Sequence, residues 1–343
     1  MSRILLAVHP QWYGVILEEK GVEELRALPG VEEVVRDDSI PYGEYTSEAE
    51  SAVLARRLSE TGADVLVTCW YTPKLTLEGY RANPRLRYLC HMSGTVKGIV
   101  ARECISGGLL VTNWGDVISR TVAEAALMMI LAALRRVAAY QVEMHERGSW
   151  RLKHVRPGSL FERRVGLHGL GAIARELVRL LGPFGCRIEA YSPHAPDRVF
   201  EELGVVRQRS LRDLYATNDV VSVHASDTPE NRHVVNADVL AAMPDGAVLV
   251  NTARGAVIDT GALLKELRSG RIHAALDVYE KEPLPPDDPL REIEDLILFP
   301  HEAGPTDDRK VDMGRLAVRN VRRYLSGERP EHVVTADRYE LMT

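Results

Sequence analysis

Three polar side chains stand directly after short apolar runs in the second half of this 343-residue sequence, and their types suit acid–base chemistry on a carbonyl group. They are Arg254 in NTARG (251–255), Glu282 in DVYEKEP (277–283) and His301 in FPH (299–301). A protonated imidazole can donate to a carbonyl oxygen that gains negative charge during hydride transfer. A carboxylate bonded to that imidazole raises its pKa and fixes its tautomer, and an arginine can bind a substrate carboxylate with two hydrogen bonds. Each residue alone could be a surface or turn residue, but together they predict an acid–base site.

A glycine motif upstream predicts a dinucleotide-binding turn. The segment VGLHGLGAIA (165–174) contains G-x-G-x-x-A between an expected strand at 165–168 and an expected helix at 173–181. Gly169 permits a tight turn, Gly171 lets a pyrophosphate approach the backbone, and Ala174 allows close packing of helix on strand. The first helical turn, with Leu170, Ala172 and Ile173 around it, offers unpaired N–H groups to the phosphates. The alternative is a glycine-rich turn that binds nothing.

The end of the next expected strand, 187–191, bears on the choice between NAD and NADP. An acidic residue usually binds the adenosine ribose there, but this chain has Ser192. A serine can still hydrogen-bond a hydroxyl, and it does not repel a 2′-phosphate, which His194 and Arg198 could contact. Both cofactors stay open, with NAD slightly favoured on general frequency alone.

The elements that must position these residues alternate between strands and helices, which predicts an α/β fold with parallel sheets covered by helices. We expect strands at 4–8, 31–36, 65–69, 86–90, 109–111, 165–168, 187–191, 220–224, 247–251, 273–277 and 296–299. In an open α/β sheet, ligands bind beyond the carboxyl ends of the strands, where all three polar side chains fall.

Helical spacing indicates helices between these strands, including 15–28, 48–60, 173–181, 261–269 and 308–325, followed by a polar tail. A longer one runs from Ser119 to about Arg147 and is apolar on several sides. Such a helix is buried between layers or shared between subunits.

Composition excludes several classes of protein. There are 43 Lys and Arg against 49 Asp and Glu, a net charge of −6, so the general signature of a nucleic-acid binder is absent. The longest apolar run, at 125–134, is too short for a membrane span, and the apolar start is too short for a signal peptide. The four cysteines show no zinc spacing, so we expect no metal and reduced thiols in the cytoplasm.

At these motifs the chain resembles the D-isomer-specific 2-hydroxyacid dehydrogenases, the family of D-3-phosphoglycerate dehydrogenase and glyoxylate/hydroxypyruvate reductases. The similar segments are the glycine turn, NTARG, ALDVYEKEP (275–283), FPH and TVAE (121–124). The resemblance implies an NAD(P)-dependent reductase of a 2-oxo acid, with Arg254, Glu282 and His301 as its catalytic residues.

The resemblance also implies further contacts and a domain order. The expected cofactor contacts are Gly169, Leu170, Gly171, Ala172, Ile173, Ser192, His224, Thr252, Ala253 and Asp277, the last to the nicotinamide carboxamide. The loop with Ser93, Gly94 and Thr95 is similar to the one whose N–H groups bind the substrate carboxylate. Two Rossmann-like or flavodoxin-like domains are expected. Residues 118–301 form the cofactor domain, inserted into a substrate domain of 1–117 and 302–343. The helix after Ser119 resembles the element that forms a homodimer.

Several positions depart from the family pattern. Ser192 replaces the ribose-binding acid, His168 stands where an aliphatic residue is usual, and Glu302 follows the histidine where an apolar residue is common. We expect Glu302 to face solvent. Formate enzymes of the same fold pair the histidine with glutamine, which Glu282 argues against. The remaining alternative is a cofactor-sensing scaffold like a corepressor, with little turnover.

Overall fold

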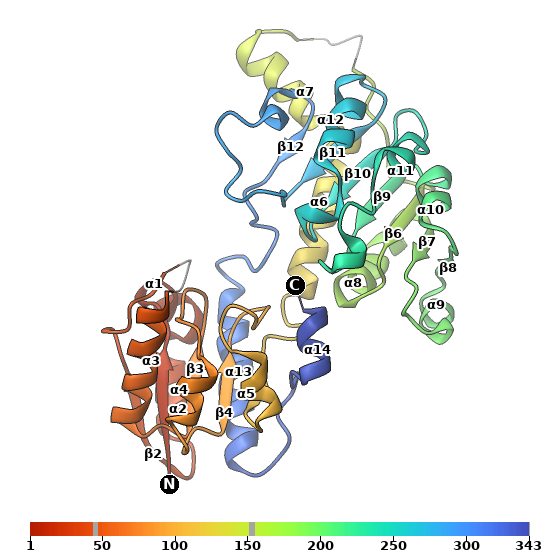
Figure 1. The fold of residues 1–343 in the computed structure, drawn as a ribbon. Coiled ribbons are helices and arrows are strands. Elements are labelled where there is room, and N and C mark those ends of the chain that lie inside the picture. The colour runs from red at the N-terminus through yellow and green to blue at the C-terminus, as the bar shows by residue number, and fades with distance from the viewer. Residues whose placement is uncertain (44–46, 151–154, 343) are drawn as a thin grey trace. The chain divides into compact units, whose positions relative to one another are not determined.

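The protein divides into two compact units, each described here by itself (Figure 1). The computed structural model describes residues 1–43, 47–150 and 155–342. Unit 1 comprises Met1–Ile118 and Thr306–Thr343, and unit 2 comprises Ser119–Pro305. The division lies one residue from the boundary expected after residue 117 and four from the one expected after 301.

Unit 1 is built on a five-stranded parallel sheet in the order β2-β1-β3-β4-β5. Its strands are β1 (Ser2–Ala7), β2 (Val31–Arg36), β3 (Val65–Thr68), β4 (Tyr88–His91) and β5 (Leu110–Thr112). β3 and β4 are buried throughout, as strands of a parallel sheet covered on both faces must be. This order is that of flavodoxin-like folds.

The helices of unit 1 start and stop at recognisable signals. They are α1 (Pro10–Trp12), η1 (Tyr13–Leu17), α2 (Glu18–Arg26), α3 (Glu48–Thr61), α4 (Leu77–Arg81), α5 (Arg102–Ser106), α13 (Lys310–Leu325) and α14 (Ala336–Leu341). Ser47 and Glu50 form a capping box at the start of α3, and Gly62 ends it in the left-handed conformation. α13 packs against η1 and α2, with Gly314 against the carbonyl group of Ile16.

The C-terminal segment is not the polar tail that the sequence suggested. Val334 donates its backbone N–H to the carbonyl oxygen of Val111 at 2.8 Å, and α14 follows with a cap at Thr335. Val334 and Tyr339 are buried in the core of unit 1. The prediction was wrong because two apolar residues among many charged ones were enough to fold the segment onto the unit.

Unit 2 contains a seven-stranded parallel sheet in the order β12-β11-β10-β9-β6-β7-β8. Its strands are β6 (Arg164–His168), β7 (Arg187–Tyr191), β8 (Val206–Arg207), β9 (Val220–Val223), β10 (Val248–Asn251), β11 (His273–Leu276) and β12 (Ile297–Leu298). The chain reverses direction across the sheet between β6 and β9, and such a switch point is where open α/β sheets bind dinucleotides. The predicted α/β class with two doubly wound units is confirmed (Figure 1).

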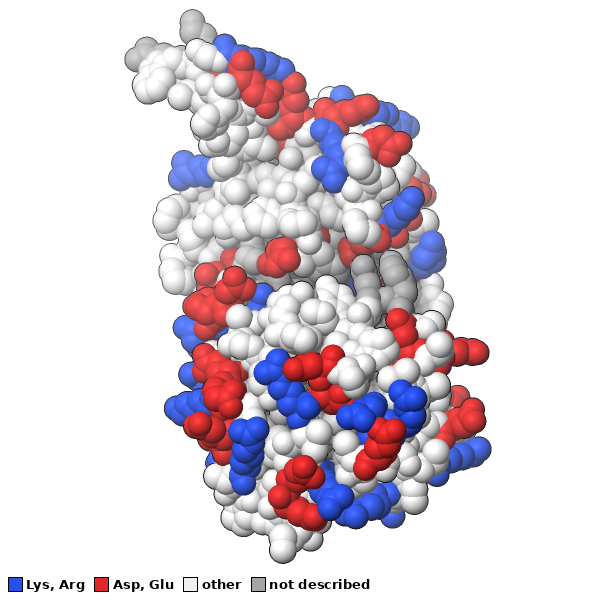
Figure 2. All heavy atoms as spheres, turned by 90° about the vertical axis from the view of Figure 1, so that its left-hand side faces the viewer, with Lys and Arg blue, Asp and Glu red and all other residues white. Residues whose placement is uncertain are grey.

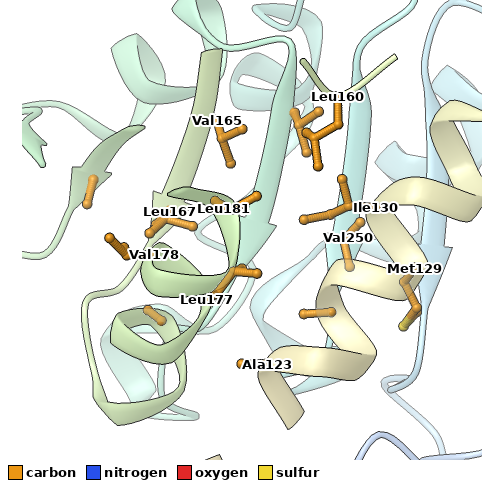
Figure 3. Packing of buried hydrophobic residues seen from close by; sticks show 14 of the residues in the cluster. Ala123, Met129, Ile130, Leu160, Val165, Leu167, Leu177, Val178, Leu181 and Val250 are labelled. Carbon is orange, nitrogen blue, oxygen red and sulfur yellow. The ribbon is translucent and has the colours of Figure 1, made fainter. Parts of the chain in front are cut away.

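The helices of unit 2 cover both faces of this sheet. They are α6 (Ser119–Leu134), α7 (Val137–Gln141), η2 (Val142–Glu146), α8 (Ala172–Leu181), η3 (Gly182–Phe184), α9 (Asp197–Leu203), α10 (Leu211–Thr217), η4 (Pro229–Asn231), α11 (Ala237–Ala241), η5 (Gly255–Val257), α12 (Thr260–Arg268) and η6 (Pro289–Glu292). α6 and α8 pack against each other and the sheet, with Ile130, Leu177 and Val250 in one core (Figure 3).

The single helix expected over 119–147 is interrupted at Arg136. This residue adopts a positive φ of 58°, and its guanidinium group binds Asp295 at 2.6 Å and the ring of His273 at 2.7 Å. These partners are far away in the sequence, so helical periodicity could not reveal the break.

Charges of both signs are interspersed over the face that Figure 2 shows, without a continuous basic patch on that face. In the described part of the chain, no helix combines the length and the apolar character that crossing a membrane requires.

Candidate active site

The loop between β6 and α8 has the geometry that the glycine motif predicts. Gly169 has a φ of +104°, and a Cβ built on it would lie 2.7 Å from the carbonyl oxygen of His224. No other residue type fits that turn without strain. Gly171, in contrast, has no atom within 4 Å of the position of a Cβ, and Ala174 is fully buried between helix and sheet. The loop is thus closed on the sheet side and open at Gly171.

Hydrogen-bond donors are left free at this open edge. Among the described residues, the backbone N–H groups of Ala172 and Ile173 in the first turn of α8 donate to no partner. Thr252, after the neighbouring β10, has a buried hydroxyl oxygen without a partner in the same part of the chain. A buried polar atom without a partner is costly, so the Thr252 hydroxyl indicates a ligand, to which the first-turn N–H groups of α8 can also donate.

Arg254 is held by the turn that follows β10. The side chain of Asn251 donates to the carbonyl oxygen of Arg254 at 3.0 Å and accepts the N–H of Ala253 at 3.0 Å. A Cβ on Gly255 would lie 1.8 Å from the carbonyl carbon of Tyr279, so this turn fits against the loop after β11 only with glycine. The position of Arg254 is therefore set by two loops together.

Glu282 and His301 form a direct pair from the loops that follow β11 and β12. Nδ1 of His301 donates to one carboxylate oxygen of Glu282 at 2.6 Å. The other oxygen of Glu282 accepts the backbone N–H of Tyr279 at 2.9 Å. The hydroxyl group of Tyr279 donates to the carbonyl oxygen of Phe299 at 2.6 Å, which ties the two loops together. Nε2 of the imidazole is left for a reacting group.

The backbone around His301 is unusual and is stabilised by Asp277. His301 has a φ of +59°, which is uncommon for a residue with a side chain. Its N–H donates to the carbonyl oxygen of Asp277 at 2.9 Å. The buried Asp277 carboxylate accepts the next two N–H groups, from Glu302 at 2.8 Å and Ala303 at 3.1 Å. Asp277 thereby holds the turn that presents the imidazole.

The protonation states follow from these contacts. The hydrogen bond to Glu282 raises the pKa of His301 above its ordinary value, despite partial burial. Burial pushes the pKa of Glu282 upward, but the bonds from His301 and the Tyr279 N–H outweigh it and leave that pKa lowered. Burial lowers the pKa of Arg254, which Glu282 and Asp227 partly oppose, and an arginine stays charged in proteins. The site therefore favours an imidazolium beside a carboxylate and a guanidinium.

Comparison with known proteins decides the family. The family model described as "D-isomer specific 2-hydroxyacid dehydrogenase, NAD binding domain" matches residues 127–303. A glyoxylate reductase of Aeropyrum pernix is 35% identical over 282 residues, which cover 80% of this chain and 84% of that protein. The chain belongs to the D-isomer specific 2-hydroxyacid dehydrogenase family.

Two further comparisons agree with this membership. A D-3-phosphoglycerate dehydrogenase of Methanocaldococcus jannaschii is 31% identical over 311 residues. That match covers 89% of this chain but only 58% of that longer protein. The solved structure of an NADPH-dependent glyoxylate/hydroxypyruvate reductase of Sinorhizobium meliloti superposes with a TM-score of 0.76 at 27% identity, and 98% of each chain is covered. The predicted family and NAD(P)-dependent oxidoreductase activity on 2-hydroxy acids are thus confirmed, and nothing in these comparisons supports a sensor or corepressor.

The residues of this 2-hydroxyacid dehydrogenase fit an NAD(P) cofactor. Gly171 is open, the first-turn N–H groups of α8 are unpaired, and the hydroxyl group of Thr252 needs a partner. These are the features that a pyrophosphate and a nucleoside require beyond the strand ends. When bound, the nicotinamide supplies or accepts the hydride.

At the expected ribose position, the loop after β7 has no acidic residue at the strand end, and Arg207 holds its backbone by hydrogen bonds. Ser192 follows β7, and its carbonyl oxygen accepts a hydrogen bond from Arg207 at 3.3 Å. Arg207 also donates to the carbonyl oxygen of Ala195 and lies over the ring of Phe200 at 4.0 Å. His194 and Arg198 are exposed. The loop therefore carries no acid at the strand end, and Arg207 fixes its backbone.

A buried histidine, His168, and a half-buried one, His224, lie next to the glycine turn. His168 contacts the hydroxyl group of Tyr215 at 3.4 Å, and Nε2 of His224 bonds to the hydroxyl group of Ser222 at 2.9 Å. Burial lowers the pKa of His168 to about 3 and that of His224 to about 4. Both rings are therefore neutral near pH 7 and add no charge to the cofactor site.

The expected substrate loop lies in unit 1, after β4. The four consecutive N–H groups of residues 93–96, which include Ser93, Gly94 and Thr95, donate to no partner in the described ranges. The side chain of Asn113 holds the loop by donating to the carbonyl oxygen of Gly94 at 2.7 Å. A run of free N–H groups is suited to an anion.

Some residues that shape the site were not singled out from the sequence. Asn251 and Tyr279 stood within the motifs, but their role as braces depends on loops that meet only in the fold. The charge of Asp227 acts to raise the pKa of Arg254. The sequence around Asp227 gives no sign of this interaction. The side chain of Glu302 is exposed, as expected.

Proposed function

We propose that the enzyme reduces a 2-oxo acid to the D-2-hydroxy acid, reversibly, with His301 as the general acid and base. The hydrogen bond of 2.6 Å between His301 and Glu282 carries this proposal. It leaves Nε2–H as the only imidazole donor available to a substrate, beside a guanidinium group that attracts carboxylates.

In the proposed reduction, Nε2–H of His301 donates its proton to the carbonyl oxygen as that oxygen gains negative charge. Glu282 stabilises the imidazolium before the transfer and orients the ring through Nδ1. Arg254 binds the carboxylate and polarises the adjacent carbonyl group. In the oxidation the same groups act in reverse, and neutral His301 accepts the hydroxyl proton.

We assign a second contact of the substrate carboxylate to the free N–H groups of Ser93, Gly94 and Thr95. Gly169–Ile173 would hold the cofactor, with Thr252 and Ala253 lining its site and His224 near the turn. Asp277 keeps lone pairs for the nicotinamide carboxamide beside the two N–H groups that it already accepts.

We further propose a homodimer in the cytoplasm. Met128 on α6 is 40% exposed, and Ala125 and Ala132 lie three and four positions from it on the same side of the helix, which Glu124 and Arg135 border. The cytoplasmic setting is supported by four free cysteines, three of them buried.

The test is the oxidation of NADH and NADPH by the purified protein with a panel of 2-oxo acids. His301→Ala should lower kcat by about 10²–10⁴-fold with cofactor affinity retained. His145→Ala, which removes an exposed histidine of η2, is the matched control and should keep the wild-type rate. A wild-type rate for His301→Ala would overturn the assigned role, and no turnover with any acid would overturn the function.

A further inference from the structure

Five aromatic rings gather at the carboxyl edge of the unit 1 sheet, and no catalytic role has used them. We define the aromatic cluster by its members, which follow β1, β3 and β5: His9, Trp12, Trp70, Tyr71 and Trp114. It contains three of the four tryptophans of the chain. None of the three indoles belongs to the buried core, and Tyr71 is 36% exposed. Large rings left partly exposed at a ligand-binding edge indicate a binding surface.

The rings form a continuous series. Trp70 lies edge-on to Trp114 with ring centroids 5.7 Å apart, and it is 5.1 Å from Trp12. Trp12 is stacked with Tyr71 at 6.2 Å. These are ordinary distances for interacting aromatic rings, so the rings contact one another without a ligand.

The series begins at the loop with free N–H groups. The N–H of Trp114 donates to the carbonyl oxygen of Ser93 at 3.1 Å. A Cβ on Gly94 would lie 2.8 Å from the indole of Trp114, so the loop and this ring are in close contact. A carboxylate bound at residues 93–96 would therefore place the rest of its molecule next to Trp114 and Trp70.

Two groups at the Trp12 end of the aromatic cluster, the indole N–H of Trp12 and the ammonium group of Lys310, bear on which ligand side chain could bind there. The indole N–H of Trp12 is buried and donates to no described residue. The ammonium group of Lys310 lies 4.9 Å from the centre of the Trp12 ring, paired with Asp307 at 2.6 Å. Lys310 already makes the cation–π contact with that ring, so a cationic side chain would have to compete with it, whereas a planar uncharged ring can pack against the aromatic rings.

We propose that the aromatic cluster is the side-chain subsite of the substrate and selects 2-oxo acids with a planar aromatic side chain over small ones such as glyoxylate. This inference rests on the proposed function. It adds the class of substrate, which the catalytic residues do not define, because they contact only the carboxylate and the carbonyl group.

The first experiment compares kcat/KM for phenylpyruvate, glyoxylate and a 2-oxo acid with a guanidinium side chain. We expect phenylpyruvate to exceed each of the others by at least about tenfold. Trp70→Leu should reduce that ratio about tenfold through KM, while Trp150→Leu, at a position 79% exposed in unit 2, should leave it unchanged. A preference for glyoxylate, or an unaltered ratio in Trp70→Leu, would overturn the inference while leaving the function intact.

A binding experiment keeps the inference testable if Trp70→Leu does not fold. In the Trp150→Phe protein, all tryptophan fluorescence comes from the aromatic cluster. Saturable quenching by phenyllactate, and not by glycolate at the same concentration, is expected. Equal or absent quenching by both acids contradicts the subsite. An enzyme inactive toward every 2-oxo acid, yet quenched by phenyllactate, would instead contradict the proposed reaction.

Discussion

At the scale of single residues, the pair of His301 and Glu282 determines how the reaction responds to pH. The pKa of His301 is raised by the Glu282 carboxylate, so the imidazolium persists to higher pH than in a free histidine. The reduction needs this protonated form, so its rate should fall as pH rises through the raised pKa. In Glu282→Gln the raising charge is lost, and the alkaline limb of the pH–rate profile should move to lower pH.

Profiles of kcat/KM against pH for the 2-oxo acid measure this shift. Glu302→Gln is the matched control, because its exposed carboxylate lies next to the histidine in sequence but forms no ion pair among the described residues. An equal shift in both variants would show that the net charge of the protein, and not the 2.6 Å contact between His301 and Glu282, determines the pH of the alkaline limb. In the oxidation direction the sign reverses, since neutral His301 is the active form.

A second residue, Ser192, bears on cofactor choice. A carboxylate at this position would accept hydrogen bonds from ribose hydroxyls and repel a 2′-phosphate. Ser192→Asp should therefore lower the ratio of kcat/KM with NADPH to that with NADH by at least about tenfold, or about 1.4 kcal/mol. Ser106→Asp adds the same charge on the surface of unit 1 and should not change the ratio. A ratio unaltered by Ser192→Asp would exclude this loop from the ribose site.

At the scale of elements, the site depends on loops from three adjacent strands that fit closely. Gly255 has the least room, because a Cβ would meet the backbone of Tyr279 at 1.8 Å. Gly255→Ala must separate the loops after β10 and β11. It should lower the free energy of unfolding by about 1–3 kcal/mol or more and abolish most activity.

Denaturant unfolding and kcat measure this, with Gly261→Ala as the control. Gly261 lies in the first turn of α12, where a Cβ would make an ordinary contact 3.4 Å from the side chain of Asp259. That variant should be neutral or stabilised by up to about 1 kcal/mol. If both variants unfolded alike, the close approach at Gly255 would not be a constraint on the site.

The elements also show what the sequence could predict. The alternation of strands and helices predicted β2 and β7 at their observed bounds, although β2 is an edge strand without a buried residue and β7 is buried at only two positions. The strand ends in turn located Arg254, Glu282 and His301. The break at Arg136 and the burial of Val334 depend on distant partners, as do the two N–H groups held by Asp277. No local pattern carries that information.

At the scale of the whole molecule, the exposed face of α6 predicts the assembly. The same helix buries Met129 and Ile130 in the core of unit 2, whereas Met128 is 40% exposed and accessible to a second copy. A two-fold interface would bring equivalent positions of the two chains close together. Met128→Glu would then place a carboxylate from each copy in the proposed interface and should convert the proposed dimer to a monomer.

Sedimentation equilibrium of the full chain measures this change. Val206→Glu is the matched control, because Val206 is 44% exposed on the edge strand β8 and away from α6. We expect that variant to remain dimeric at concentrations where Met128→Glu is a monomer. A monomeric wild-type protein, or a dimer that Met128→Glu leaves intact, would contradict the proposed role of Met128 and α6 in dimerisation.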